Sequence, residues 1–347
     1  MMKKRIMYVD YLKIFAIFGV VMSHSLTQIL QENVHSFKWN VGNIILQTVS
    51  PAVGIFFMVS GALILSSERT NSIGYLFKHR LVKVGVPFLI WSAATIAFSY
   101  RVDGQITFMI WLKKLLLIYN QFPSPAFWFM YPLIFFYLIS PLVKIFVDHA
   151  SNKVIDYIIW LWLITNLLLP DIAAMLPQQI ALYFTNIPNS NLVLMGQTFG
   201  YFLLGYRLHK LPIVKNDWSK HFIFSLILLV LIVIINYFNT VYQLNIQIIG
   251  YTSLLTLLMT MEVYLTVKNW SHFHELSDKV NHSATTVAGL CFGIYLSHGI
   301  VMQAVEQYLH IGSFWLVFLL TSIICIIMTY VISKIPKVGY YLIGVEN

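Results

Sequence analysis

Long apolar runs recur along the whole 347-residue chain and constrain its fold more than any other feature. Each run is about 20 residues long, the length that a helix needs to cross the hydrocarbon core of a bilayer. Only 10% of the residues are charged, while 59% are hydrophobic and 16% are aromatic. Most of the chain must therefore face lipid or other helices. We predict an all-α, polytopic membrane protein with one domain, residues 1–347.

We expect ten membrane-spanning helices with both termini in the cytoplasm. Their approximate limits are 8–30, 43–66, 83–100, 126–147, 155–172, 192–208, 221–239, 248–267, 286–306 and 314–335. Most of the 22 Lys and Arg residues then lie on the inner side, as the positive-inside rule requires. The net charge of +9 therefore indicates topology, and we expect no nucleic-acid partner. The basic residues before the first run indicate a retained signal anchor, and residues 107–120 form an amphipathic segment suited to the outer interface.

Three ionisable residues lie in the first span: Asp10, Lys13 and His24. Charged groups at membrane depth are costly, so they are functional candidates by default. Lys13 and His24 share one helix face, because eleven residues complete about three turns and about 16 Å. His24 could act as a general base, or it could hydrogen-bond between helices. Lys13 could snorkel to the inner surface, or pair with Asp10 or Glu262.

Other polar groups also stand out. Lys78, Arg80 and Lys83 stand at the start of the third span, where such residues more often set topology or contact anionic lipid, but they could also bind phosphates. Glu262 and His298 lie inside the eighth and ninth spans. A short His272-Phe273-His274 segment lacks a second ligand cluster, so we expect no metal site.

The first-span pattern resembles a known family. Asp10-Tyr11-Leu12-Lys13, followed after ten residues by His24, is similar to the opening motif of the acyltransferase-3 family of integral membrane acyltransferases. Five further segments resemble later motifs in the family's order: Phe56-Phe57-Met58-Val59-Ser60-Gly61, Arg80-x-x-Lys83-x-x-x-Pro87, Phe127-Trp128-Phe129-Met130-Tyr131, Tyr201-Phe202-Leu203-Leu204-Gly205 and Gly293-Ile294-Tyr295-Leu296-Ser297-His298.

The resemblance implies transfer of an acyl group, usually acetyl, from cytoplasmic acyl-CoA to a hydroxyl of a cell-envelope glycan or its lipid-linked precursor. It implies that His24 is catalytic, that Lys13 replaces the motif's basic residue, and that Arg80 belongs to the donor side. Lys13 stands where the family often has Arg, which removes a bidentate fork. Ala126 stands where a His often precedes the Trp-Phe pair, so no role carries over to it. We expect a stand-alone form without a fused extracellular hydrolase-like domain.

The residues and the resemblance together predict one site. His24, Lys13 and Asp10 form the catalytic group, and the anion-binding residues Arg80, Lys83 and Lys78 hold the donor. The supporting residues that we expect to orient the base, stabilise the oxyanion or complete the site are Ser60, Trp128, Tyr131, Glu262, Tyr295 and His298. Acyl-CoA is a co-substrate, and no permanently bound cofactor is expected. The lipid bilayer is a partner, and the expected location is a multi-pass position in a bacterial plasma membrane.

A different class of protein fits the buried charges as well. An exporter or flippase for a polysaccharide or lipid-linked saccharide would use intramembrane His, Lys and Glu as a proton path. That alternative gives no purpose to the basic cluster before the third span. Movement of substrate without acyl-CoA would favour the transporter.

Overall fold

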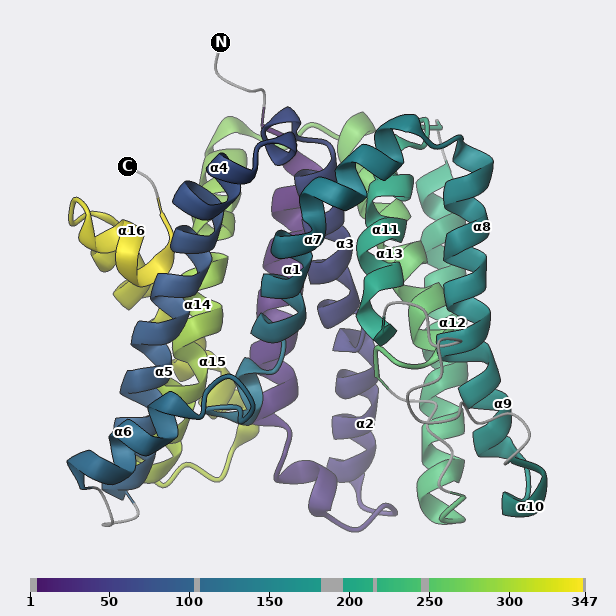
Figure 1. Cartoon of the computed structure of the whole chain (residues 1–347). Helices are drawn as coiled ribbons and strands as arrows, with labels where there is room; N and C mark the ends of the chain where they lie inside the picture. Colours follow the sequence, from purple (N-terminus) through teal and green to yellow (C-terminus); the bar gives the residue numbers. More distant parts are fainter. Residues whose placement is uncertain (1–4, 103–106, 182–195, 215–216, 245–249, 346–347) are drawn as a thin grey trace. The chain divides into compact units, whose positions relative to one another are not determined.

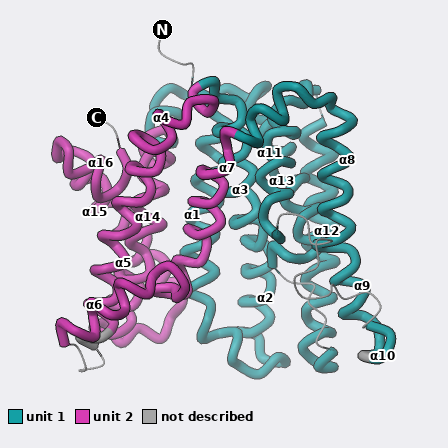
Figure 2. The backbone as a smooth tube through the Cα atoms, viewed as in Figure 1, with its two compact units in different colours: residues 1–68, 142–284 teal, residues 69–141, 285–347 magenta. Residues whose placement is uncertain are grey.

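The structure is a computed structural model that describes residues 5–102, 107–181, 196–214, 217–244 and 250–345. Within these ranges every regular element is a helix (Figure 1), which confirms the predicted all-α class. The chain forms two compact units, shown separately in Figure 2. Unit 1 comprises residues 1–68 and 142–284, and unit 2 comprises residues 69–141 and 285–347.

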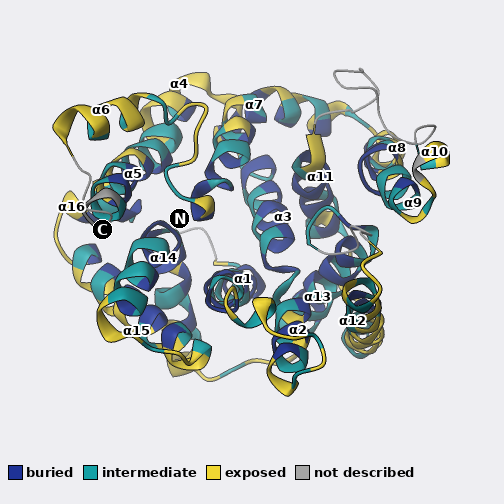
Figure 3. Cartoon of the chain, turned by 90° about the horizontal axis from the view of Figure 1, so that it is seen from below, coloured by how far each residue is buried: buried dark blue, intermediate teal, exposed yellow. Residues whose placement is uncertain are grey.

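Unit 1 contains most of the helices. They are α1 (Met7–Ser25), η1 (Ile29–Gln31), α2 (Phe37–Val49), α3 (Ala52–Leu65), α8 (Asn152–Leu163), η5 (Ile164–Leu168), α9 (Leu169–Met175), α10 (Gln178–Ala181), α11 (Gly196–Lys210), α12 (Asp217–Val241) and α13 (Leu254–Phe273). Serine side chains begin several of them: Ser36, Ser151 and Ser253 each accept a backbone N–H of the first turn. Figure 3 shows α1 and α3 as largely buried helices, whereas α12 exposes one apolar face.

Two glycines bring α3 and α11 into backbone contact. A Cβ atom added at Gly61 would lie 1.7 Å from the carbonyl oxygen of Phe202. A Cβ atom added at Gly205 would lie 2.0 Å from the carbonyl oxygen of Met58. Small residues at such crossings let helices pack closely without a water-driven hydrophobic effect. Two of the family-like segments, in the second and sixth predicted spans, therefore meet along this α3–α11 seam.

A buried amide cluster joins α2 to α12. Asn236 Nδ2 donates to Asn43 Oδ1 at 2.7 Å, and Asn43 Nδ2 donates to the Val233 carbonyl at 3.1 Å. Gln47 Nε2 donates to Asn43 Oδ1 at 3.3 Å. Interhelical amide bonds of this kind fix the pairing of two otherwise apolar helices.

Unit 2 is built around α5. Its elements are α4 (Ile73–Tyr75), the π-helix η3 (Leu76–Leu81), α5 (Val82–Val102), α6 (Phe108–Leu116), η4 (Pro125–Phe127), α15 (Phe314–Ser333) and α16 (Val338–Ile343), with η2 (Glu68–Asn71) at the junction of the units. Two long helices belong partly to each unit: α7 (Met130–His149) and α14 (Asp278–Leu309).

The amphipathic segment predicted at 107–120 forms helix α6. Thr107 caps its N-terminus by accepting the backbone N–H of Ile110. Lys113 and Lys114 are exposed, and the indole N–H of Trp111 donates to the Ala93 carbonyl at 2.9 Å. The helix is confirmed, while its place at the membrane surface stays a prediction.

Eight helical segments in the described ranges are long and apolar enough to cross a membrane. They are Met7–Ser25, Phe37–Leu65, Ile73–Ser99, Pro125–His149, Asn152–Met175, Asp217–Val241, Asp278–Leu309 and Phe314–Ser333. The remaining two predicted spans, 192–208 and 248–267, contain α11 and α13. The described part of α11 has 15 residues, and polar residues lower the hydropathy of α13. Ten spans and the inward orientation of the termini therefore stay predictions.

Candidate active site

Helix α1 carries the three residues of the predicted catalytic group. Asp10 lies in the first turn and is only 3% exposed, and its carboxylate accepts a hydrogen bond from Arg5 Nε at 2.7 Å. Lys13 is half-buried one turn further along, and His24 is half-buried in the last turn. Because α1 is one continuous helix, it separates the cation from the imidazole as the spacing predicts.

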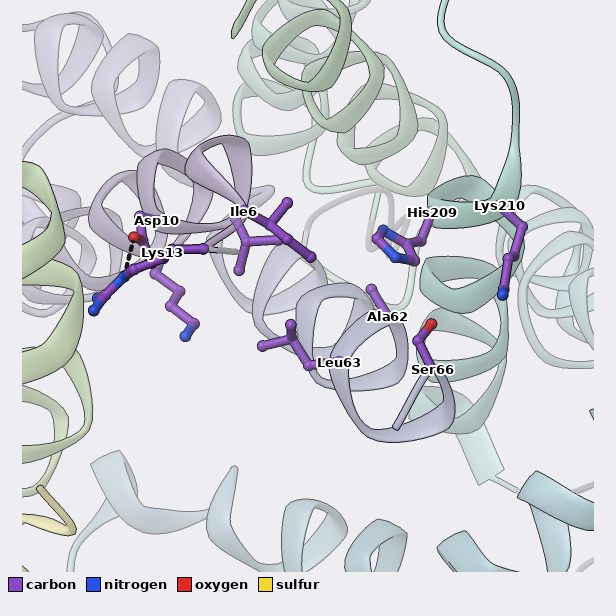
Figure 4. A pocket seen from close by; sticks show the side chains of 10 residues that line it. Ile6, Asp10, Lys13, Ala62, Leu63, Ser66, His209 and Lys210 are labelled. Carbon is purple, nitrogen blue, oxygen red and sulfur yellow. Dashed lines mark hydrogen bonds and ion pairs between the residues drawn. The ribbon is translucent and has the colours of Figure 1, made fainter. Parts of the chain in front are cut away.

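A cavity of about 480 Å³ opens at the start of α1 in unit 1. It is lined by Arg5, Ile6, Val9, Asp10, Lys13, Ala62, Leu63, Ser66, His209 and Lys210. Figure 4 shows Asp10 and Lys13 on one side, and His209 and Lys210 of α11 on the other. Lysine and arginine outnumber the single carboxylate, so this cavity suits an anionic ligand.

His209 and Lys210 were not among the predicted site residues. Their signal in the sequence is the basic cluster Arg207-Leu208-His209-Lys210, which the positive-inside rule alone does not distinguish from topological charge. The cluster falls at the C-terminal end of α11, where basic side chains also suit the helix dipole. The fold brings it beside Lys13, which lies almost two hundred residues earlier in the chain.

A second cavity of about 660 Å³ shares Ile6 and His209 with the first. The Tyr8 hydroxyl lies in hydrogen-bond contact with His209 Nδ1 and is 3.1 Å from the Tyr264 hydroxyl. The Tyr11 hydroxyl donates to Asn281 Oδ1 at 2.6 Å. Tyr8 and Tyr11 thus tie α1 to α11, α13 and the start of α14, a role that the sequence alone did not distinguish from ordinary aromatic packing.

Lys268 of α13 closes the C-terminal end of α11. Its buried ammonium donates to the carbonyl oxygens of Leu208 at 2.7 Å, His209 at 3.1 Å and Leu211 at 2.7 Å. The last carbonyls of a helix have no partner within it and carry the negative end of its dipole. Lys268 satisfies them and so holds the helix end that carries His209.

We expect Lys268→Met to lower the free energy of unfolding by about 3 kcal/mol, because buried carbonyls lose a charged donor. Thermal unfolding of the purified protein in detergent measures the change. Lys279→Met is the matched control, since Lys279 is an exposed lysine in the same unit. Equal melting temperatures for the two variants would contradict the capping role.

The predicted donor residues lie in unit 2, around the π-helix η3. Lys78 is exposed, whereas Arg80 and Lys83 are half-buried. The Arg80 guanidinium lies 5.8 Å from the centroid of the Tyr75 ring, and its buried Nη1 has no hydrogen-bond partner among the described residues. A buried guanidinium nitrogen without a partner is ready to donate to an anion. Short π-helical turns also occur frequently at functional sites.

Segments from the fourth and ninth predicted spans meet in unit 2. The hydroxyl of buried Tyr295 donates to the Ala126 carbonyl at 2.6 Å, and its ring packs edge-on against Phe129. His298 is fully buried, and its Nδ1 lies 2.5 Å from the Tyr295 carbonyl. Because a carbonyl can only accept, Nδ1 is the nitrogen that donates in this contact.

The other supporting residues have different surroundings. The Tyr131 hydroxyl donates to the Ile118 carbonyl, with the Gln121 carbonyl at 3.3 Å, so it anchors the segment after α6. Trp128 packs edge-on against Phe129, with ring centroids 6.4 Å apart. In unit 1, Ser60 is half-buried on α3, and Glu262 pairs with His221 of α12 at 2.6 Å.

The predicted site residues thus fall into two groups. Unit 1 holds Asp10, Lys13, His24, Ser60 and Glu262, and unit 2 holds Lys78, Arg80, Lys83, Trp128, Tyr131, Tyr295 and His298. No cluster of three or more His, Cys, Asp or Glu side chains suited to a metal ion occurs in the described ranges.

Comparison with known proteins agrees with the motifs. A protein-family model described as an acyltransferase domain matches residues 6–334. No curated protein and no solved structure matches the chain. The family match contains α1 with His24, the α3–α11 seam, the turn at Arg80 and the buried Tyr295–His298 segment. The chain therefore belongs to the acyltransferase-3 family of membrane acyltransferases.

Proposed function

We propose that the protein transfers an acyl group, most simply acetyl, from cytoplasmic acyl-CoA to a hydroxyl of a cell-envelope glycan or lipid-linked sugar. One observation carries this proposal: α1 holds a cation-lined cavity near one end and His24 near the other. Coenzyme A has several negative charges joined to a reactive thioester by a long, thin arm. Helix α1 has cations at one end, which suit the negative charges, and a base at the other end, which suits the thioester.

The proposed chemistry needs one base. Neutral His24 takes the proton of the acceptor hydroxyl, and the oxygen attacks the thioester carbonyl. The carbon–sulfur bond then breaks, and the thiolate takes the proton from the imidazolium. The products are the ester and free coenzyme A, so no net proton is gained or lost. Transfer of the acyl group through His24 itself is the covalent version of the same step.

Each unit carries a cationic group suited to the phosphates of the donor. Arg5, Lys13 and Lys210 surround the cavity of unit 1, and Arg80 offers its buried nitrogen in unit 2. A plasma-membrane location would place the basic ends on the cytoplasmic side, where acyl-CoA is made, and the acceptor on the envelope side.

The test is an assay on the purified protein in lipid nanodiscs. Release of the free thiol from acetyl-CoA is measured with and without envelope glycan or a lipid-linked sugar. Acceptor-dependent thiol release and an acetylated glycan in the mass spectrum support the proposal. Transport of the saccharide in vesicles without acyl-CoA, together with no thiol release, would instead identify an exporter or flippase.

We expect Arg80→Ala to raise the KM for acetyl-CoA about tenfold, because a charged hydrogen bond to the donor is lost. The kcat at saturating donor and the KM for the acceptor should change little. Arg69→Ala is the matched control, because Arg69 lies over the same Tyr75 ring, at 5.4 Å, but is exposed. An unchanged donor KM in Arg80→Ala would remove Arg80 from the donor site.

A further inference from the structure

The segment after α15 packs against the centre of unit 2. Helix α16 contacts α5 and α15 (Figure 2), and it lies beyond residue 334, where the family match ends. Ile343 is 0% exposed and packs against Gly293, where an added Cβ would lie 2.7 Å from an Ile343 side-chain carbon. The indole N–H of Trp91 donates to the Leu342 carbonyl at 2.9 Å. A six-residue helix is not stable alone, so these contacts hold it in place.

The same segment reaches the turn that carries Arg80. The Tyr340 hydroxyl donates to the His79 carbonyl, inside η3, at 3.3 Å. Gly344 ends α16 with a positive φ of 65°, and an added Cβ would lie 2.9 Å from the Lys83 carbonyl oxygen and 3.1 Å from the Phe292 ring. Only glycine combines this backbone conformation with such a close approach at little cost.

The turn needs such support because η3 is a π-helix. A π-helical turn holds one residue more than an α-helical turn and is rare without a specific reason. Return to α-helical geometry would rotate the residues before the turn by about 100° relative to those after it, the angle of one residue. The basic side chains of the turn would then change direction relative to α5.

We propose that residues 338–344 are a positioning segment that holds the Lys78–Lys83 turn in the geometry that binds the donor's phosphates. Tyr340 fixes η3 from one side, and Gly344 fixes the start of α5 at Lys83. Ile343 supplies the anchorage by packing on Gly293 of α14. The inference rests on the proposed function, because it assigns the turn to acyl-CoA, and it adds a segment outside the matched family domain.

The test uses Ile343→Ala and Gly344→Val in the full-length protein in nanodiscs. Coenzyme A binding is measured by calorimetry, and KM is measured separately for acetyl-CoA and for the acceptor. We expect the Kd for coenzyme A and the KM for acetyl-CoA to rise about tenfold, the effect of losing one charged hydrogen bond. The acceptor KM and the kcat at saturating donor should stay near the wild-type values.

Two matched controls distinguish an effect on the position of the turn from a general loss of folded structure. Ile335→Ala shortens an isoleucine that is 45% exposed, and Gly312→Val adds a side chain where no atom lies within 4 Å. Both should bind coenzyme A as the wild type does. If either test variant fails to fold, Tyr340→Phe is a milder variant, because it removes only the hydroxyl that contacts His79. Tyr340→Phe should still raise the Kd for coenzyme A. Tyr341→Phe, at an exposed tyrosine, should leave that Kd unchanged.

The outcomes distinguish the two proposals. Wild-type binding of coenzyme A together with unchanged Kd values in the folded variants would overturn the positioning role and leave the proposed function intact. Absence of coenzyme A binding by the wild type, with no thiol release, would overturn both. A parallel loss of donor affinity, acceptor affinity and kcat would show a merely structural role and would also overturn the inference.

Discussion

Replacing His24 with alanine is expected to reduce acyl transfer by about 10²–10⁴-fold, the range for loss of a general base. His24 is the ionisable group in the last turn of α1, far along the helix from the cation-lined cavity. Donor binding should survive, because the cations around that cavity are untouched. The expected signature is therefore a fall in kcat with the Kd for coenzyme A unchanged.

The measurement is thiol release from acetyl-CoA in nanodiscs, with calorimetric binding of coenzyme A on the same sample. His149→Ala is the control, since His149 is an exposed histidine whose Nδ1 contacts the Ile145 carbonyl of its own helix. Full transfer activity in a folded His24→Ala protein would refute the catalytic assignment. Loss of coenzyme A binding would instead place His24 in the donor site.

Intact-protein mass spectrometry distinguishes proton transfer to His24 from transfer of the acyl group through His24. Incubation with acetyl-CoA and no acceptor should add one acetyl group if His24 carries the acyl group. That mass should be absent in His24→Ala. An unmodified wild-type protein that still transfers acetyl to a glycan indicates that His24 takes only the proton.

The helical class was predictable because span length and low charge leave few alternatives for this chain. The α6 helix and the continuity of α1 from Asp10 to His24 were also predictable, because capping and helical periodicity are local properties. The spans predicted at α11 and α13 stay predictions. Helices inside a bundle can carry polar groups that neighbours satisfy, so their hydropathy falls although they remain buried: Lys268 of α13 is 3% exposed.

The site was predictable only where one helix or one short segment carries it. Asp10, Lys13 and His24 lie on one helix, so the sequence shows their relation directly. The cavity beside Lys13 includes His209 and Lys210, which approach α1 only through tertiary packing of α11. The contact between Tyr340 and His79 joins residues that are far apart in the chain, and no local pattern predicts it.

The hydrogen-bond partners of Asp10 and Glu262 illustrate the same limit. Asp10 accepts a hydrogen bond from Arg5, five residues away, and Glu262 pairs with His221 of the neighbouring helix α12. The nearest opposite charge depends on side-chain reach and helix crossing, neither of which residue spacing specifies. The amide cluster between α2 and α12 was missed for the same reason.

Substitutions in the α3–α11 seam should have a large effect on stability. Gly61→Ala and Gly205→Ala should each lower the free energy of unfolding by about 3 kcal/mol, because the added methyl meets a backbone carbonyl that cannot rotate away. The helices must separate to admit it. Chemical unfolding in detergent, followed by circular dichroism, measures the change.

Gly→Ala should raise the free energy of unfolding at two glycines outside the seam. An added Cβ at Gly85 of α5 or Gly289 of α14 meets no atom within 4 Å. Gly→Ala at these helical positions should stabilise the protein by about 0.5–1 kcal/mol, since alanine loses less backbone entropy on folding. Equal effects at all four glycines would show that helix propensity, rather than the close approach of α3 and α11, explains the glycines of the seam.

The double variant Gly61→Ala/Gly205→Ala tests the seam as one contact. The two glycines lie on opposite helices and face backbone atoms of Phe202 and Met58. Once one methyl has pushed the helices apart, the second meets more space, so the combined loss should be smaller than the sum of the single losses. If the two losses of stability were strictly additive, each glycine would avoid a separate, local steric clash. The two family-like segments would then be packed independently, and the fixed spacing between α3 and α11 would need another cause.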